Sequence, residues 1–354
     1  MNVRIQAGEM ARMTKVLAGC LDGVSELSSS VELRHEDQLF SIRAVSGGQF
    51  VKMCAPMMGG DGEHFLVDGK MLNNVCQKAR GEITLTTDGK TCIVKAGGRT
   101  RLPMVSGRLA EPEPVTGKTV KVDTEAFRKA VDLVRYAVAD PGNPRVILTG
   151  ILMETDGTEM HLTALDGFQL ARESIPCTGD SFTAVVPGAA MKKVTDCASG
   201  DATLEITCGG GRMHFRSDGA ELHCSLLTGN YVELDRIIPK EFGTEVMFRA
   251  EEMKNALSSG AVANVKNHLV KMTFCQHTVK IQSRSELADF EGEIESMQTG
   301  NDLVISFNDR YVMNALGAIG NEYVIMRANT PVAPAVFQGK DSGGIHLTLP
   351  VRTV

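Results

Sequence analysis

The sequence predicts an α+β fold in which one strand-and-helix unit occurs six times on antiparallel sheets. The unit is clearest at residues 118–137, where apolar and polar side chains first alternate as in a half-buried strand. From Phe127 to Val134, apolar side chains then fall at i, i+3, i+4 and i+7, which is the stripe of an amphipathic helix. Asp123 or Thr124 lies between the two patterns and can cap the helix.

Five further segments show the same order of strand, entry residue and helical stripe. Neighbouring entry residues are 55 to 64 positions apart, and a regular period indicates a repeated fold. A chain of mixed helices and strands would give one or two such steps by chance. The entry residues are Ala7, Asp68, Asp123, Pro187, Arg249 and Asn308. The predicted helices occupy residues 9–20, 68–80, 123–138, 187–197, 250–267 and 308–320.

Between the helices, short turns separate alternating segments and predict β-hairpins. Examples are the turns at residues 87–90, 155–157 and 209–211, the last of which consists of glycine alone. A turn this short joins antiparallel neighbours, because parallel strands need a longer crossover. The sheets are therefore predicted to be antiparallel.

Two linkers divide the repeated units into pairs. Residues 109–114 are extended and acidic, residues 238–243 form a second break, and each linker precedes a new strand-and-helix unit. A chain of 354 residues is also too long for one ordinary hydrophobic core. We therefore predict three domains with two units each, at residues 1–116, 117–243 and 244–354.

The composition is typical of a soluble protein in a reducing compartment. No run of about 18 apolar residues is present, and the first ten residues lack the apolar core of a signal peptide. The nine cysteines are an odd number without paired spacing, and Cys20, Cys76 and Cys197 fall on helical stripes. These features predict a cytoplasmic protein with reduced cysteines and no membrane partner.

Charge is distributed unevenly between the predicted helices and the rest of the chain. The formal net charge is −6, yet the predicted helices contain 13 Lys and Arg against 9 Asp and Glu. The helices thus carry +4 and the remainder −10, so the helical side could attract a polyanion. The alternative, which charge alone leaves open, is that Lys and Arg simply favour solvated helical faces. The basic residues of the later turns are Lys15, Lys78, Arg80, Arg135, Lys192, Lys193 and Lys266.

The motifs of common enzyme classes are absent from the sequence. The triple glycine lacks the Lys and helix that follow in a phosphate-binding loop. Asp166 and Gly167 follow a predicted strand, and Asp-Gly at such a position indicates a turn rather than a catalytic residue. The histidines are scattered, and a strand would point His223 and Cys224 to opposite faces. We therefore predict no catalytic residue, metal site or cofactor, while an enzyme with an unrecognised site stays open.

Three stretches resemble the bacterial DNA polymerase III beta subunit, the sliding clamp family. They are RVILTGILMETDGTEMHLTALDGFQLA at 145–171, LLTGNYVELDRIIPK at 226–240 and LTLPVRTV at 347–354. The resemblance covers the whole chain in order and implies a homodimer that closes head to tail into a ring around double-stranded DNA. The helices of such a ring line the hole, which would account for their basic residues. Sliding implies contacts to phosphates without reading of bases.

The resemblance also implies an apolar cleft between the middle and last domains. In the family this cleft binds short motifs of the DNA polymerase III catalytic subunit, the clamp loader and other proteins. The implied cleft residues are Leu148, Leu165, Gly167, Phe168, Gln169, Leu170, Val232, Arg236, Ile237, Pro334, Leu347, Leu349, Pro350, Val351 and Arg352. The residues expected to face DNA are Arg12, Lys15, Lys78, Arg80, Arg128, Arg135, Arg145, Lys192, Lys193, Lys254 and Lys266. Val262 matches a position of the dimer interface, and ordinary core packing is the alternative for each apolar cleft residue.

Several positions depart from the family pattern. Where the family has Thr-Asp-Gly-His-Arg-Leu, residues 165–170 read LDGFQL, so the cleft loses an Arg and gains an aromatic ring. Val232 replaces a usual Pro, and Gly188 and Ala189 stand where the family has basic residues. We therefore expect a divergent clamp with a shifted peptide preference. The alternative is a clamp-like ring that serves as a protein-interaction scaffold without sliding on DNA.

Overall fold

The computed structural model describes residues 2–36, 39–58, 64–198, 203–263 and 266–352. Contacts between residues divide the chain into two compact units. Unit 1 comprises Met1–Arg128, Asp156–Thr158 and Pro176–Leu226, and unit 2 comprises Lys129–Thr155, Glu159–Ile175 and Leu227–Val354. This division runs through the predicted middle domain, so the three predicted domain boundaries stay a prediction. Among the described residues, no helix has the length and apolar character needed to cross a membrane.

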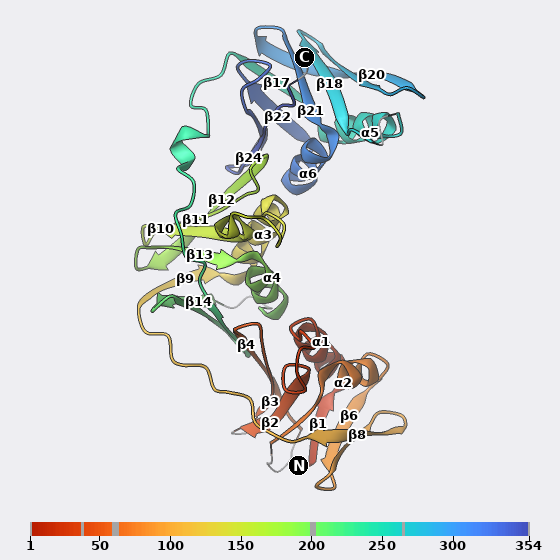
Figure 1. The fold of residues 1–354 in the computed structure, drawn as a ribbon, viewed down its shortest axis with the longest axis vertical. Coiled ribbons are helices and arrows are strands. Elements are labelled where there is room, and N and C mark those ends of the chain that lie inside the picture. Colours follow the sequence, from red (N-terminus) through yellow and green to blue (C-terminus); the bar gives the residue numbers. More distant parts are fainter. Residues whose placement is uncertain (1, 37–38, 59–63, 199–202, 264–265, 353–354) are drawn as a thin grey trace. The chain divides into compact units, whose positions relative to one another are not determined.

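Six α-helices in the described part of the chain each follow directly on a β-strand (Figure 1). The helices are α1 (Ala7–Ala18), α2 (Gly69–Cys76), α3 (Thr124–Val134), α4 (Gly188–Cys197), α5 (Ala250–Ala261) and α6 (Asp309–Ile319). The strands before them are β1 (Asn2–Gln6), β5 (Phe65–Asp68), β9 (Lys118–Asp123), β13 (Phe182–Pro187), β17 (Thr244–Arg249) and β21 (Leu303–Asn308). The predicted α+β fold and its repeated strand-and-helix unit are confirmed.

Side-chain caps hold the first turn of three helices. Asp68, Asp123 and Asn308 each accept a hydrogen bond from a backbone N–H of that turn, at 2.7, 2.7 and 3.0 Å. Asp123 rather than Thr124 therefore caps α3, and the Thr124 side chain is buried.

Three helices are clearly shorter than predicted. Helix α3 ends at Val134 instead of residue 138, and a 3-10 turn at Arg135–Ala137 follows it. Helix α2 ends at Cys76 instead of residue 80, because the chain turns through Gly81, at φ 71°, into the next strand. Helix α5 ends at Ala261 instead of residue 267, and residues 264–265 of the predicted helix lie outside the described part. The prediction that Lys78, Arg80 and Lys266 lie on helices is therefore wrong.

Antiparallel pairing links the strands of unit 1 in a single order. From β1 the pairing runs through β6 (Glu82–Thr87), β7 (Thr91–Lys95), β8 (Arg99–Val105), β5, β2 (Ser30–Glu36) and β3 (Leu39–Ser46) to β4 (Gln49–Pro56). Strand β4 pairs with β16 (Ala220–Ser225), and the order continues through β15 (Arg212–Ser217), β14 (Thr203–Gly209) and β9 to the end of β12 (Gln169–Gly179). The hairpin turns predicted at 87–90 and 209–211 join β6 to β7 and β14 to β15. The antiparallel prediction is confirmed here.

Unit 2 contains a second antiparallel order. It begins with the first half of β12 and runs through β24 (Ile345–Thr348), β23 (Ala335–Gly339), β22 (Tyr323–Ala328), β17, β20 (Asp289–Gly300), β19 (Thr278–Arg284) and β18 (Leu269–Cys275) to β21. A further antiparallel hairpin of the same sheet pairs β10 (Gly150–Thr155) with β11 (Glu159–Leu165). Strand β24 ends at Thr348, and residues 349–352 have no regular secondary structure.

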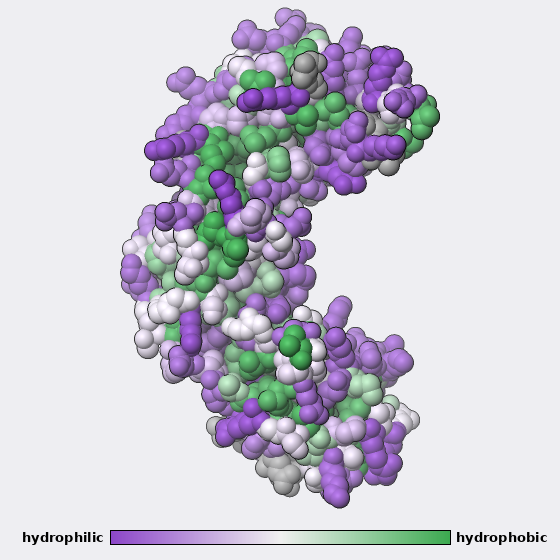
Figure 2. Space-filling model, in the orientation of Figure 1, coloured by the Kyte–Doolittle hydropathy of each residue, from purple (hydrophilic) through white to green (hydrophobic). Residues whose placement is uncertain are grey.

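The apolar stripes of the helices pack into the cores. On α3 the predicted stripe from Phe127 to Val134 is buried, and the Phe127 ring centroid lies 6.2 Å from that of Phe215 on β15. On α2 the buried side includes Leu72 and Cys76, and Met71 is 53% exposed. On the face drawn in Figure 2, apolar side chains appear in small groups among hydrophilic ones.

Candidate functional site

A turn centred on Asp166 joins β11 to β12 and forms the middle of the predicted cleft. The Asp166 Oδ1 atom accepts hydrogen bonds from the backbone N–H groups of Phe168 and Gln169 at 2.7 and 2.8 Å. Its Oδ2 atom accepts a further hydrogen bond from Nε2 of Gln169 at 3.0 Å. Gly167 has a φ of 102°, a conformation that residues with a side chain rarely adopt. Asp166 therefore holds a turn, as predicted.

The end of the chain is hydrogen-bonded to this turn. Strand β24 pairs with the first half of β12, so that Leu170 lies opposite Leu347. The backbone N–H of Leu349 then donates to the carbonyl oxygen of Phe168 at 2.9 Å. The structure thus brings together two predicted parts of the cleft that are far apart in the sequence.

Most of the predicted apolar wall is buried by the chain itself. Leu148, Leu165, Leu170 and Leu347 are at most 5% exposed. In contrast, Phe168 is 57% exposed and Val351 is 39% exposed. The buried leucines are therefore part of the core, and Phe168 presents apolar surface to solvent.

Helix α6 supplies two neighbours of the turn that were not predicted. The Tyr311 ring stacks on Phe168 with a centroid distance of 5.9 Å and an interplanar angle of 21°. Asn314, one helical turn further on, donates from Nδ2 to Oε1 of Gln169 at 3.1 Å. Burial and the nearby Asp166 carboxylate raise the pKa of Tyr311. The only sequence signal was that both polar side chains lie beside the apolar stripe of the predicted helix.

The segment that carries Val232, Arg236 and Ile237 approaches β11 through Tyr231. The Tyr231 hydroxyl donates to the carbonyl oxygen of Thr163 at 3.3 Å. Arg236 lies in a short 3-10 helix and forms an ion pair with Glu233 at 2.6 Å. Its side chain is 79% exposed, so it remains available to rim a cleft. Pro334 directly precedes β23, whose Ala335 lies opposite Thr348 of β24.

The last described residues leave the turn and follow β21. The backbone N–H of Val351 donates to the carbonyl oxygen of Ser306 at 2.8 Å. Val351 and Arg352 line an open cavity of about 860 Å³ together with residues of β18–β21. Leu349 therefore lies at the predicted cleft, whereas Val351 and Arg352 border a different hollow of unit 2. Residues 353–354 of the predicted terminal motif lie outside the described residues.

Several basic residues predicted to face DNA form ion pairs within their own helix or the turn after it. Arg12 pairs with Glu9, Arg128 with Glu125, Arg135 with Asp132 and Lys192 with Asp196, at 2.5 to 3.2 Å. Lys193 donates to Oε1 of Gln49 at 2.8 Å. The helices therefore do not present uniform positive charge. Lys15 and Lys254 lie on α1 and α5, and Arg145 precedes a short 3-10 helix.

Val262, the predicted interface residue, follows directly on α5. Its side chain is 78% exposed. An apolar side chain with this exposure is compatible with burial by a partner, although single exposed apolar residues are common.

The register of β15 and β16 corrects the prediction that the histidines are scattered. His214 lies opposite His223, and the two rings stack with centroids 4.0 Å apart. Burial lowers the pKa of both side chains, that of His223 to about 4. The sequence argument compared positions along the chain and missed this pair, because residues nine positions apart meet across a hairpin.

Two family models match the chain. The model described as DNA polymerase III beta subunit, central domain, matches residues 121–233, and that of the C-terminal domain matches residues 235–352. Together these ranges cover more than half of the 354 residues.

Two curated relatives are named beta sliding clamp. The beta sliding clamp of Streptococcus pneumoniae is 28% identical over 242 residues, which are 66% of this chain and 64% of that protein. The beta sliding clamp of Lactococcus lactis is 28% identical over 281 residues, which are 76% and 72% of the two chains. The chain thus matches slightly less than two thirds of the pneumococcal protein.

Solved structures agree in fold over the full length. The DNA polymerase III beta subunit of Thermotoga maritima superposes with a TM-score of 0.92 at 21% identity, covering 100% of both chains. A sliding clamp of Pseudomonas aeruginosa, solved bound to griselimycin, gives the same TM-score, identity and coverage. Since the two family models also match consecutive ranges of the sequence, the chain belongs to the DNA polymerase III beta subunit family.

Proposed function

We propose that the chain is a DNA sliding clamp, a processivity factor that encircles duplex DNA and tethers the replicative polymerase. The observation that carries this proposal is the match of both family models along residues 121–352, on a fold with six strand-and-helix units. The two matched ranges support three domains at 1–116, 117–243 and 244–354, with the first domain before the matched part. Two chains would form the ring as a homodimer.

The proposed contact with DNA is weak and independent of sequence. Lysine and arginine side chains bind phosphates by charge and carry no information on base identity. Because Arg12, Arg128 and Lys192 are engaged by neighbouring carboxylates, their attraction for phosphate is reduced. Enclosure by the ring, rather than affinity, would then keep the protein on DNA, which suits sliding.

Peptide motifs of the polymerase, the clamp loader and other replication proteins are the proposed ligands of the cleft at the Asp166 turn. Phe168, stacked on Tyr311, would provide the exposed apolar surface for an anchor side chain. Such a site binds and positions its partners, so the proposed role is non-enzymatic. A cytoplasmic location follows from this role in bacterial replication.

Loading onto DNA of two topologies tests the proposal. The protein, its clamp loader and ATP are incubated with nicked circular DNA, and bound protein is separated by gel filtration. A sliding clamp is retained on the circle and is lost after the circle is linearised by a restriction enzyme. A scaffold without sliding would bind the polymerase peptide yet never be retained on the circle, and this result would refute the proposal.

A further inference from the structure

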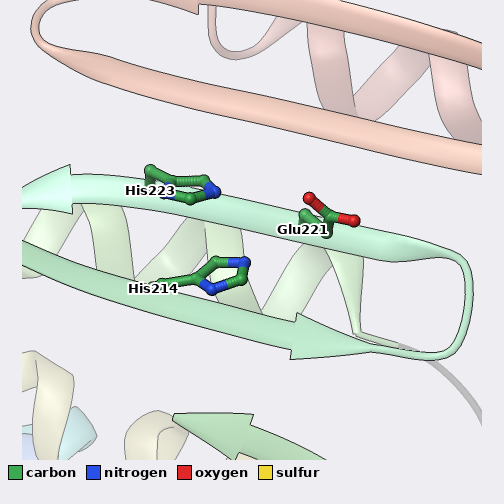
Figure 3. Close-up of side chains that lie close together, drawn as sticks. All are labelled: His214, Glu221 and His223. Atoms are coloured by element: carbon green, nitrogen blue, oxygen red, sulfur yellow. The ribbon is translucent and has the colours of Figure 1, made fainter. Parts of the chain in front are cut away.

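Three side chains that can ligate a metal ion lie together on the β15–β16 hairpin. Figure 3 shows His214 on one strand, with His223 and Glu221 on its neighbour. His214 and His223 are opposite each other in the register, and Glu221 precedes His223 by two positions. Alternate residues of a strand share a face, so Glu221 and His223 point to the same side. One potential ligand atom from each of the three lies within 4.8 Å of the others.

We propose that His214, Glu221 and His223 bind a divalent transition-metal ion, with Zn²⁺ as the representative. Two imidazole nitrogens and one carboxylate oxygen are a donor set that Zn²⁺ takes, with water in the fourth position. Bonds of about 2.0–2.2 Å require the three donors to move closer together. Rotation of the Glu221 side chain and of the two rings can supply this movement, because the backbone already holds all three residues on one face.

The hydrogen-bonding state of the imidazoles supports this inference. Nε2 of His214 and Nδ1 of His223 are buried and accept or donate no hydrogen bond among the described residues. Buried polar atoms without a partner are uncommon in native proteins, and a bound ion or water can supply the missing partner. The rings are partly buried, and the Phe50 ring centroid lies 5.6 Å from that of His223. A metal ion bound here would be shielded on that side by an apolar ring.

The charged groups around the cluster are compatible with a cation. Arg216 lies opposite Glu221, and it forms an ion pair with Glu205 at 3.1 Å. Arg212, two positions before His214, forms an ion pair with Glu113 at 2.8 Å. Lys52 also lies opposite Glu221, across the β4–β16 pairing. Both arginines thus have acidic partners of their own.

The position of the cluster indicates what a metal ion would do. Strand β16 pairs with β4 through His223 and Phe50, within unit 1. Strand β4 lies in predicted domain 1 and β16 in predicted domain 2, so this pairing connects the two predicted domains. A metal ion on the neighbouring β15–β16 pair would stiffen the hairpin that carries this junction. The site is separate from the Asp166 turn, so its occupancy is independent of the proposed peptide binding.

Zinc titration of the whole protein tests the inference. Protein treated with EDTA and kept reduced is titrated with Zn²⁺ by isothermal titration calorimetry, and its thermal midpoint is measured with and without Zn²⁺. We expect one Zn²⁺ per chain and a midpoint that rises when Zn²⁺ is added. The His223→Gln and Glu221→Gln variants should each bind at least tenfold more weakly, with circular dichroism confirming that they fold.

His161→Gln is the matched control. His161 lies on the β10–β11 hairpin with Glu159 at 3.6 Å, and the residue opposite it on β10 is Glu154. This variant should bind Zn²⁺ as the wild type does. Buried cysteines are poor competitors, since burial raises the pKa of Cys20 to about 11 and that of Cys76 to about 12. Absence of binding at millimolar Zn²⁺, or equal affinity in all variants, would overturn the inference and leave a histidine pair that only stacks.

Discussion

Phe168 places an aromatic side chain in the Asp166 turn. The ring is 57% exposed and rests on Tyr311, so it is held in place while one face stays open. The hydrogen bonds of Asp166 to the backbone of the same turn add to this rigidity. A side chain that is fixed before binding loses little entropy when a ligand packs against it. At this scale the structure supports an anchor site that uses ring surface instead of charge.

Truncation of cleft side chains that are not fully buried should weaken peptide binding. We expect Phe168→Ala and Ile237→Ala each to cost about 1–3 kcal/mol in affinity for a polymerase-tail peptide, because apolar contact area is lost. Fluorescence anisotropy with a labelled peptide measures this change. Leu287→Ala removes a side chain that is 97% exposed in unit 2 and should leave the affinity unchanged. Equal affinity in all three variants would rule out this cleft.

Leu170→Ala is a less informative test of the same cleft. Leu170 is 2% exposed, and loss of a buried leucine typically destabilises a protein by about 2–5 kcal/mol. A drop in peptide affinity would then be mixed with partial unfolding. The variant is useful only when its unfolding free energy is measured in parallel.

Two helical glycines should respond to alanine in opposite directions. A Cβ at Gly69 in α2 would lie 2.5 Å from Cδ1 of Leu21 and 2.9 Å from Cγ1 of Val31, whereas at Gly8 in α1 it meets no atom within 4 Å. Gly69→Ala should destabilise the protein by about 1–3 kcal/mol through overpacking. Gly8→Ala should stabilise it by roughly 0.5–1 kcal/mol, since alanine favours the helix. Urea unfolding measures both, and a stabilising Gly69→Ala would contradict the packing of α2.

At the scale of elements, the predicted strand-and-helix units are present, but the predicted ends of the helices were inaccurate. The apolar period fixed which segments become helices, because it depends only on burying one face. The end of α2 depends instead on the turn at Gly81, which no stripe encodes. The histidine pair was missed for a related reason, since cross-strand partners follow from register and not from spacing along the chain.

The acidic linker is more firmly held than its composition predicted. Oε1 of Glu111 lies 2.7 Å from Nη1 of the buried Arg43 and 3.0 Å from Nη2 of Arg34. Burial acts to raise the pKa of Glu111, and the hydrogen bonds and charges of Arg43 and Arg34 outweigh it, so the pKa lies below its usual value. The linker residue is thus attached to β2 and β3 of unit 1 rather than extended in solvent.

Replacement of Glu111 should give a pH-dependent loss of stability. A carboxyl with a lowered folded-state pKa contributes stability that is complete above its unfolded pKa, about 4.3, and is lost as the pH falls through the folded value. Glu111→Gln should therefore be less stable than the wild type at pH 7, by roughly 0.5–1 kcal/mol because the side chain is half exposed. The difference should shrink below about pH 4.

Urea unfolding at pH 7 and pH 3.5 measures this difference. Glu113→Gln is the matched control, since Glu113 is 80% exposed and its partner Arg212 is 44% exposed. The Glu113→Gln variant should lose less stability than Glu111→Gln at both pH values. A Glu111→Gln deficit that stays constant with pH would exclude an ionic attachment of the linker.

At the scale of the whole molecule, the proposal requires a second chain. Each chain carries six helices in its described part, and the proposed ring needs two such chains. Val262 is the residue predicted to lie at the dimer interface, and it is 78% exposed. Burial of an unpaired charge at an interface is strongly unfavourable.

A charge at Val262 should therefore shift the protein towards monomers. We expect multi-angle light scattering at micromolar concentration to give the mass of two chains for the wild type and that of one chain for Val262→Asp. Val332→Asp places the same charge at another exposed apolar residue, 57% exposed, and should leave the dimer intact. A wild-type mass equal to one chain would count against the ring, whatever the variants do.

The sequence by itself determined the local elements of this protein, because apolar period, caps and tight turns act between residues close along the chain. It therefore predicted six helices, antiparallel hairpins and the Asp166 turn. Only the tertiary structure decided which distant residues meet, including Tyr311 on Phe168, Leu349 on the turn and His214 opposite His223. Those contacts depend on strand register and helix docking, which arise from packing across the whole chain and leave no mark in local spacing.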